Sequence, residues 1–493
     1  MESRDFFQLR RRLPPVTRVR RRVPAKRYYI ARCVIMETTQ LINKCSAALY
    51  DYDPNPVEYD YSSDEYYYGD FDVENVRYGD LSVEEKLEKL KSLREETNWE
   101  DKAQIYYFFR RFVDLVVNWK HQLPDLRDIF LPEEIELFLR ESTINASGST
   151  NNFRGQYVIR FVVRTGYKDE PEVDEDGQPL LLRTTPVHSA QYEKNSTIIH
   201  NLFKIYDRFD MNYTNQLGFT HFHAACRHGC DDVVEKFLEL GQDPNLLVTK
   251  TGHSPLHFAL FWGHKKTSEL LLRNGADPNS ANKKGNTPLH IICQRSDDDD
   301  LLKIFFEIVD DIDQSVQIDA RDKSGLTPLQ WAVLNFLPNV VDVLLDRGAD
   351  LSSFVFPAAT YSRERTEFKH DFHGMDEFKM KLVPDTMAVV ERLEKRGFEL
   401  KQSDALEIIK IFVKHELFQR SGPLMRGGEE VYEYEEVTRK FIFRWTLEFF
   451  LLLTTYQLPI LCCEKILAFL KCEDLLKICL AAEVFINDQR QNM

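Results

Sequence analysis

Residues with the spacing of an active site or a metal centre are missing from this sequence. It contains no Ser/His/Asp, Cys/His or paired-carboxylate arrangement suited to catalysis, and no glycine-rich loop that would hold a phosphate. Its nine cysteines lack the CxxC spacing of metal and redox sites, which favours buried thiols in a reducing compartment. The acidic run 297–300 does not fit a cation, whose ligands are spaced around a loop, and an exposed loop that caps the next helix is favoured. We therefore expect no catalytic activity, no metal and no cofactor.

A secretory signal and a transmembrane segment are missing as well. Residues 1–35 contain eleven Lys and Arg but no apolar stretch of the signal-peptide type. They fit a nuclear localisation patch or a transit peptide, although a disordered tail or a true start at Met36 is favoured. The apolar residues 441–455 are interrupted by Arg444 and Glu448 before they reach the roughly 18–20 residues of a membrane span. The expected location is the cytoplasm, with the nucleus as the second choice, and no membrane partner is expected.

Acidic residues outnumber basic ones outside the amino-terminal tail. The formal net charge is −15, and residues 1–35 contribute +9, which leaves −24 on the remainder. Such an acidic body is a poor match for nucleic acid and favours protein partners. Residues 50–80 are rich in Tyr, Asp and Glu without aliphatic core residues, so residues 1–80 are expected to be a disordered tail, basic and then acidic. A solvated linker is favoured here over a tyrosine-phosphorylation or docking segment.

One four-residue motif occurs five times in the middle of the chain. The copies are Thr185-Pro186-Val187-His188, Thr220-His221-Phe222-His223, Ser254-Pro255-Leu256-His257, Thr287-Pro288-Leu289-His290 and Thr327-Pro328-Leu329-Gln330. Their first positions are 35, 34, 33 and 40 residues apart, and the last four copies follow a glycine by two residues. The Thr or Ser hydroxyl can cap a helix that Pro begins, and the glycine permits the preceding tight turn. A second helix is expected after each motif, and in three repeats it is closed by Gly241, Gly275 or Gly348, which suit a left-handed residue past a helix end.

This stretch resembles the ankyrin-repeat family, whose Thr-Pro-Leu-His signature recurs at about 33 residues. The resemblance implies an all-α solenoid of about five repeats over residues 160–351, in which the motif histidines link neighbouring loops. It also implies that a protein target binds in the concave groove, at the two positions that follow the Thr-Pro-Leu-His-x-x-x core of each repeat. Those positions are Tyr192 and Glu193, Arg227 and His228, Phe261 and Trp262, Gln294 and Arg295, Leu334 and Asn335. Phe261 and Trp262 stand out, because aromatic and Arg side chains dominate binding energy at interfaces.

Helical segments are expected on both sides of the repeats. Residues 81–145 form a predicted helical block with a capping box at Ser82 and Glu85, either as a separate subdomain or as a cap on the first repeat. Residues 157–163 are β-like in composition and are predicted to form a short extended run. Within the connecting segment 352–440, loops are expected over 354–381, followed by helices over 387–400 and 405–418.

The carboxyl-terminal segment 441–493 carries a second resemblance. After an apolar helix come Leu-Pro, Ile-Leu, Leu and Asp-Leu, followed by a further helix over 477–485. This order resembles the PRANC domain, the F-box-like carboxyl terminus of ankyrin proteins in poxviruses and parasitoid wasps. The resemblance implies helix-in-groove docking of a Skp-type linker and its cullin ubiquitin ligase. The residues that would dock it are Leu458, Pro459, Ile466, Leu467, Leu470, Asp474 and Leu475. A plain helical cap on the repeats is the alternative.

Together these features predict an interaction protein. In one hypothesis the repeats capture a target and the F-box-like segment presents it to a ubiquitin ligase, so that proximity raises the effective concentration. In the other, the repeats bind or sequester a signalling or transcription factor without any link to ubiquitin. The two hypotheses differ in one requirement, because only the adaptor needs Pro459, Leu467 and Leu470 exposed.

Overall fold

A computed structural model describes residues 81–117, 119, 122–144, 154–190, 196–295, 299–357, 372–414 and 445–446. Within these residues the regular structure is helical, and extended backbone forms only isolated bridges. The expected all-α fold is therefore confirmed. The chain divides into two compact units, one comprising Asp64–Lys401 and the other Met1–Ser63 with Gln402–Met493. No helix of the described residues is both long enough and apolar enough to cross a bilayer.

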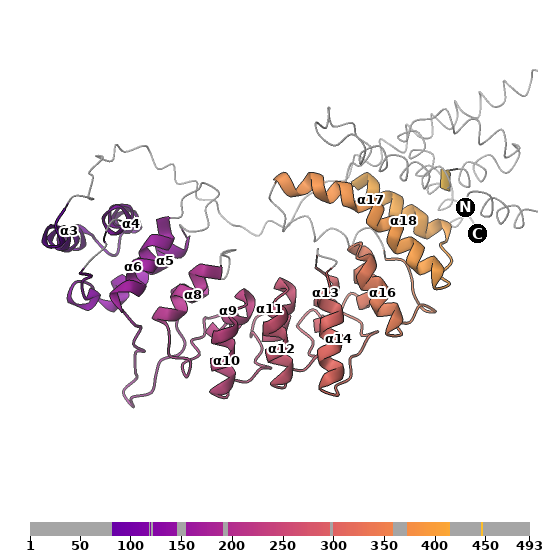
Figure 1. Cartoon of the computed structure of the whole chain (residues 1–493), viewed down its shortest axis with the longest axis horizontal. Helices are drawn as coiled ribbons and strands as arrows, with labels where there is room; N and C mark the ends of the chain where they lie inside the picture. The colour runs from indigo at the N-terminus through magenta and orange to yellow at the C-terminus, as the bar shows by residue number, and fades with distance from the viewer. Residues whose placement is uncertain are drawn as a thin grey trace, which may run out of the picture. The chain divides into compact units, whose positions relative to one another are not determined.

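The middle of the first unit consists of helix pairs stacked side by side (Figure 1). Each motif begins an inner helix, and the following helix packs outside it. The inner helices are α7 (Pro186–Ser189), α9 (His221–His228), α11 (Pro255–Trp262), α13 (Pro288–Cys293) and α15 (Pro328–Leu334). The outer helices are α8 (Ser196–Ile205), α10 (Asp231–Glu239), α12 (Lys265–Arg273), α14 (Leu301–Asp311) and α16 (Pro338–Asp346). Inner helices contact inner helices of the next pair, and from α10 onward outer helices contact outer ones, which makes two layers.

The sequence motif explains where the inner helices begin. The hydroxyls of Thr220, Ser254, Thr287 and Thr327 each accept a hydrogen bond from the backbone N–H three residues later. Proline occupies the first helical position in α11, α13 and α15, where its missing N–H is not needed. The preceding turn needs a glycine, because Gly252 has a φ of 73° and an added Cβ would lie 2.8 Å from the backbone nitrogen of Lys283. Capping, proline and glycine thus fix the same boundary in successive repeats.

Leucines occupy equivalent buried positions in successive inner helices. Leu256 and Leu289 follow the motif prolines of α11 and α13, and both have no exposed surface. Full burial of such a side chain contributes about 1.5–3 kcal/mol. Because each repeat buries its apolar face against the repeats beside it, the array depends on continuous stacking.

The amino-terminal block covers the first repeat, as one of the two sequence hypotheses expected. It contains α3 (Val83–Glu96), α4 (Lys102–Val116), a short 3₁₀ turn, η2 (Leu126–Asp128), α5 (Pro132–Ile144) and α6 (Arg154–Thr165). The predicted capping box is present, since the Ser82 hydroxyl accepts from the Glu85 N–H and the Glu85 carboxylate accepts from the Ser82 N–H. Helix α5 contacts the inner helix α7, and α6 contacts the outer helix α8. The α5–α6 pair therefore stacks on the array like one more repeat.

The prediction of an extended run over 157–163 is wrong. These residues lie inside α6, where Val158, Ile159 and Val162 are fully buried. Their spacing places the three side chains on one side of a helix, and burial against α5 and α8 outweighs the weak preference of β-branched residues for strands.

The expectation of loops up to residue 381 is also wrong in part. Helix α17 runs from Phe372 to Lys395, with Pro384 inside it, so it begins well before the predicted start at 387. It packs on α16, and the Arg392 Nε lies 2.6 Å from the Asp342 carboxylate. Helix α18 (Gln402–Lys414) belongs to the other unit and coincides with most of the predicted helix at 405–418.

Candidate functional site

The loops between repeats are joined by the motif histidines, as the resemblance implied. In each case the ring Nε2 reaches the backbone carbonyl of the next loop, at 2.9 Å from His223 to Leu246 and 2.9 Å from His257 to Asn286. The Nδ1 atom accepts the N–H of the residue that caps the same helix, for example Ser254 at 3.2 Å. Since Nδ1 accepts, the proton resides on Nε2, which donates to the neighbouring carbonyl. The histidines thus hold the loops in register and are structural residues.

Burial keeps these histidines neutral. It lowers the pKa of His188, His223 and His257 to about 4, and the hydrogen bonds to backbone carbonyls only partly oppose it. In the fifth repeat the same place is taken by Gln330, whose amide oxygen accepts from the Thr327 N–H and whose amide nitrogen donates to the Val355 carbonyl at 2.8 Å. Glutamine therefore makes both bonds without a titratable group.

The exposed aromatic pair lies at the end of α11. Phe261 is 39% exposed and Trp262 is 41% exposed, and their rings meet edge to face with centroids 5.5 Å apart. The guanidinium of Arg227, near the end of α9, lies 4.8 Å from the centroid of the Trp262 ring. A cation–π contact of this kind contributes about 0.5–1 kcal/mol and holds the indole in place. The two repeats together therefore present a pre-positioned apolar surface with a positive charge beside it.

Two other residues predicted for this face are buried inside the stack. His228 is 7% exposed, and burial lowers its pKa to about 3. Arg295 is 8% exposed, and its guanidinium covers Gly263, where an added Cβ would meet it at 2.7 Å. The physical reason is that the turn after each inner helix touches the turn of the next repeat. Neither side chain offers a surface to a target, and both predictions are corrected.

The remaining predicted positions differ from repeat to repeat. Gln294 is half-buried, and Leu334 and Asn335 are buried, with the Asn335 amide donating to the Cys293 carbonyl at 2.7 Å. Tyr192 and Glu193 lie outside the described residues. So do all seven residues predicted to dock a Skp-type linker, Leu458, Pro459, Ile466, Leu467, Leu470, Asp474 and Leu475.

An ionic cluster that the sequence did not suggest joins the cap to the first repeat. Arg183 donates to Glu136 on α5 at 2.5 Å and to Asp169 at 2.8 Å. The Tyr213 hydroxyl donates to the other Asp169 oxygen at 2.7 Å. These residues are far apart in the sequence, so no spacing could have revealed them.

In the described part of the chain, no group of three or more His, Cys, Asp or Glu side chains could hold a metal ion. Cys226, Cys230 and Cys293 are buried free thiols, as expected, and burial raises the pKa of each. Such thiols are poor nucleophiles.

Comparison with known proteins agrees with the repeat geometry. A family model described as ankyrin repeats (3 copies) matches residues 187–282 and 256–354. The B-cell lymphoma 3 protein homolog of Mus musculus is 27% identical over 196 residues, which is 38% of this chain and 40% of that protein.

Two further relatives match over shorter stretches. The transient receptor potential cation channel subfamily A member 1 of Drosophila melanogaster is 26% identical over 143 residues, 28% of this chain and 12% of that protein. The E3 ubiquitin-protein ligase KEG of Arabidopsis thaliana is 29% identical over 143 residues, 29% of this chain and 8% of that protein. The chain thus spans less than half the length of each of these relatives.

Proposed function

We propose, from the premise that residues 187–354 are ankyrin repeats and therefore a protein-interaction module, that this chain is an adaptor for ubiquitination. In this proposal the repeats bind a target protein, and the F-box-like segment 441–485 recruits a Skp–cullin-type ubiquitin ligase. The chain itself has no catalytic activity and acts by proximity. It works in the cytoplasm or the nucleus.

The aromatic pair on α11 carries the target-binding part of the proposal. Phe261 and Trp262 keep about two fifths of their surface exposed, although most large apolar side chains of the repeats are buried. Rigid aromatic side chains lose little entropy on binding, and Arg227 already orients the indole. A Phe261→Ala/Trp262→Ala variant should fold normally and bind a target at least roughly tenfold more weakly.

The ubiquitin part of the proposal is tested by linker binding. The full chain would be titrated with a purified Skp-type linker by isothermal calorimetry, beside a Pro459→Ala/Leu467→Asp variant. We expect saturable binding that this variant loses, because an aspartate in a helix–groove contact is desolvated without a partner.

A matched control keeps this result interpretable. Leu240 is 60% exposed at the end of α10, so Leu240→Asp adds the same charge on the repeats and should leave linker binding unchanged. Circular dichroism of all three proteins would verify folding. No binding by the folded wild-type chain would remove the ubiquitin link and leave the alternative, a sequestering protein of a signalling or transcription factor.

A further inference from the structure

Four lysines lie in consecutive turns that precede the inner helices. Lys250, Lys283, Lys284 and Lys323, here called the fingertip lysines, are exposed and lie one or two residues before Gly252, Gly285 or Gly325. Among the residues that the structure describes, none of the four forms an ion pair.

The fingertip turns touch one another, which aligns these lysines. The backbone N–H of Lys283 donates to the Thr251 carbonyl at 3.0 Å, and that of Lys323 donates to the Lys284 carbonyl at 2.9 Å. Across turns 249–252, 282–285 and 322–325 the acidic residue is Asp322. Its side chain is buried and accepts hydrogen bonds from the N–H groups of Ser324 and Leu326. The exposed charge of the row is therefore positive.

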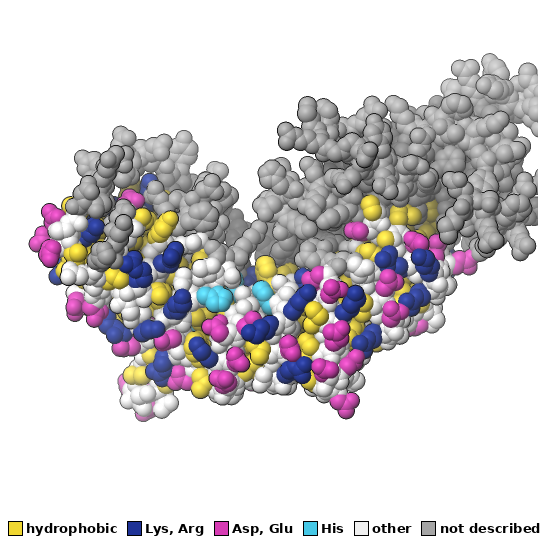
Figure 2. Space-filling view, in the orientation of Figure 1, with side chains coloured by type: hydrophobic (Ala, Val, Ile, Leu, Met, Phe, Trp, Pro, Cys, Tyr) yellow, Lys and Arg dark blue, Asp and Glu magenta, His cyan; other side chains and the backbone are white. Residues whose placement is uncertain are grey.

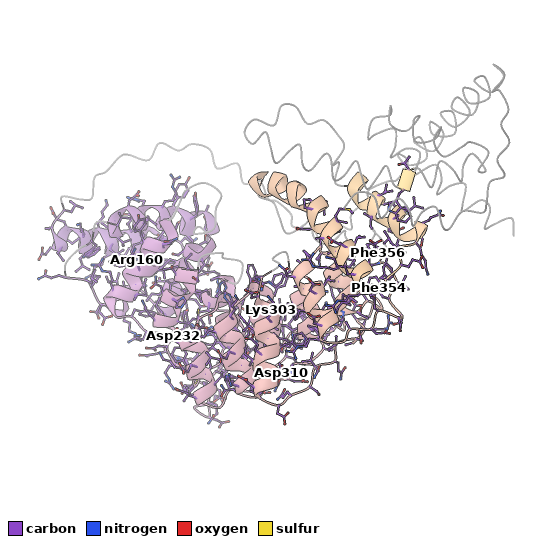
Figure 3. The ribbon with its side chains drawn as sticks, turned by 45° about the vertical axis from the view of Figure 1, so that its right-hand side comes forward. Arg160, Asp232, Lys303, Asp310, Phe354 and Phe356 are labelled. Atoms are coloured by element: carbon purple, nitrogen blue, oxygen red, sulfur yellow. The ribbon has the colours of Figure 1, made fainter. Side chains whose placement is uncertain are left out.

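On the outer helices, two arginines form ion pairs with acidic residues of the neighbouring repeat. Arg273 pairs with Asp311 at 3.1 Å, and Arg347 pairs with Asp310 at 2.8 Å, each across a repeat boundary. Figure 2 shows Lys and Arg side chains interspersed with Asp and Glu over the visible face of the repeats, and Asp310 is labelled in Figure 3. In a chain with a formal net charge of −15, these four neighbouring lysines without an ion pair form a local positive surface.

The first fingertip has the opposite charge. Its turn contains Asp174, Glu175 and Asp176, all exposed, before Gly177. The charges along the fingertips therefore run from acidic in the first repeat to basic in the third, fourth and fifth. A partner with a single acidic segment would be drawn to the later repeats and repelled from the first.

We propose that the fingertip lysines bind an extended acidic segment of a protein partner. Packed helices are about 8–10 Å apart, and an extended chain advances about 3.3 Å per residue, so carboxylates three residues apart match successive turns. This inference rests on the proposed function only in taking the repeats as the protein-binding surface, and it adds the chemistry of the partner. The acidic first fingertip and the net charge disfavour nucleic acid, which is a continuous polyanion.

The test compares two sets of exposed lysines. The fingertip variant is Lys250→Gln/Lys283→Gln/Lys284→Gln/Lys323→Gln. The outer-face variant is Lys204→Gln/Lys265→Gln/Lys266→Gln/Lys303→Gln, which removes the same charge from α8, α12 and α14, with Lys303 labelled in Figure 3. All eight side chains are exposed, so both variants should fold.

Fluorescence anisotropy would measure the binding of a labelled synthetic peptide, with glutamate at every third position, to the full-length protein. A peptide of equal composition with contiguous glutamates and a single-stranded oligothymidylate serve as comparison probes. We expect the spaced peptide to bind best, and the fingertip variant to raise its Kd about tenfold at low salt while the outer-face variant changes it less than about twofold. The fingertip variant should bind the Skp-type linker as the wild type does, because linker docking is assigned to residues 441–485.

Each contrary outcome overturns this inference. Equal weakening of peptide binding in both variants would mean that net charge alone attracts the peptide. Tighter binding of the oligothymidylate than of the peptides would mean a nucleic-acid surface. No peptide binding at low salt would mean that no acidic partner binds at the fingertip lysines. If peptide binding fails while linker binding persists, this inference falls and the adaptor proposal stands. If linker binding fails while peptide binding persists, the adaptor proposal falls and this inference stands.

Discussion

At the scale of single residues, the motif histidines perform two tasks with one neutral ring. Nδ1 of His257 accepts the N–H of Ser254 within its own helix start, and Nε2 donates to the Asn286 carbonyl in the next repeat. Protonation of Nδ1 would set two donors against each other in a site that water does not reach. A side chain that caps one helix and bridges two repeats therefore has to remain uncharged.

This argument gives a pH dependence with a definite sign. The pKa of His257 falls from an ordinary value of 6.5 to about 4 in the folded chain, chiefly through burial. Its contribution to stability is fully present above about pH 6.5 and is lost as the pH falls toward 4, because the unfolded chain takes up the proton first. His257→Gln, which copies Gln330, should reduce the fall in unfolding free energy between pH 7 and pH 4 by up to about 3 kcal/mol.

Urea denaturation of both proteins across this pH range measures the difference. Wild-type Gln330 shows that the amide can make both bonds, so the variant should lose little stability at pH 7. An unchanged pH slope in His257→Gln would contradict the assignment of the acid sensitivity to this histidine.

At the scale of elements, the attachment of the cap depends on one ionic cluster. Arg183 is 17% exposed at its side chain and satisfies both Glu136 and Asp169, which are 15% and 8% exposed. Arg183→Met would leave two partly buried carboxylates without their shared cation. Removing one member of such a group costs about 3 kcal/mol or more of unfolding free energy. We expect helices α3–α6 to open before the repeats do.

Hydrogen exchange measured by mass spectrometry locates the effect. A matched control is Arg208→Met, because Arg208 pairs with Asp210 at 2.8 Å but both side chains are about half exposed. That variant should lose less than about 1 kcal/mol. Equal loss in the two variants, or faster exchange confined to the distant repeats, would show that the cluster does not hold the cap.

The elements also show which parts of the fold the sequence could predict. Boundaries set by local chemistry were predictable, because Thr or Ser capping, Pro at the first helical position and Gly in the turn each act within a few residues. Helix α6 was not predictable from its sequence. The aromatic and β-branched residues at 157–163 favour a strand locally and become helical through packing on α8. The start of α17 was missed for a related reason, because Pro384 inside a helix signals a boundary.

The candidate binding face was also predictable only in part. The positions of Phe261 and Trp262 after the repeat motif were evident from the sequence, and the structure places both at the end of α11 and partly exposed. His228 and Arg295 occupy equivalent positions, but contacts across the repeat boundary bury them. The role of the α5–α6 pair was hidden as well, because it stacks like a repeat without the Thr-Pro-Leu-His motif and is recognisable only from its contacts with α7 and α8.

At the scale of the whole repeat-containing unit, stability should behave as a chain of neighbour interactions. Leu289 in α13 is buried, and its helix contacts α11, α14 and α15. Leu289→Ala removes apolar surface and leaves a cavity, which costs about 2–5 kcal/mol. In a solenoid each repeat touches only its neighbours, so hydrogen exchange should accelerate most in α11–α15 and least in the cap helices α3–α5. Leu240→Ala, at a residue that is 60% exposed, should change little and serves as the control. A uniform acceleration of exchange from α3 to α17 would mean instead that the cap and the repeats unfold as one cooperative block. In such a block, a destabilising change at any repeat boundary would also destabilise the surface around Phe261 and Trp262.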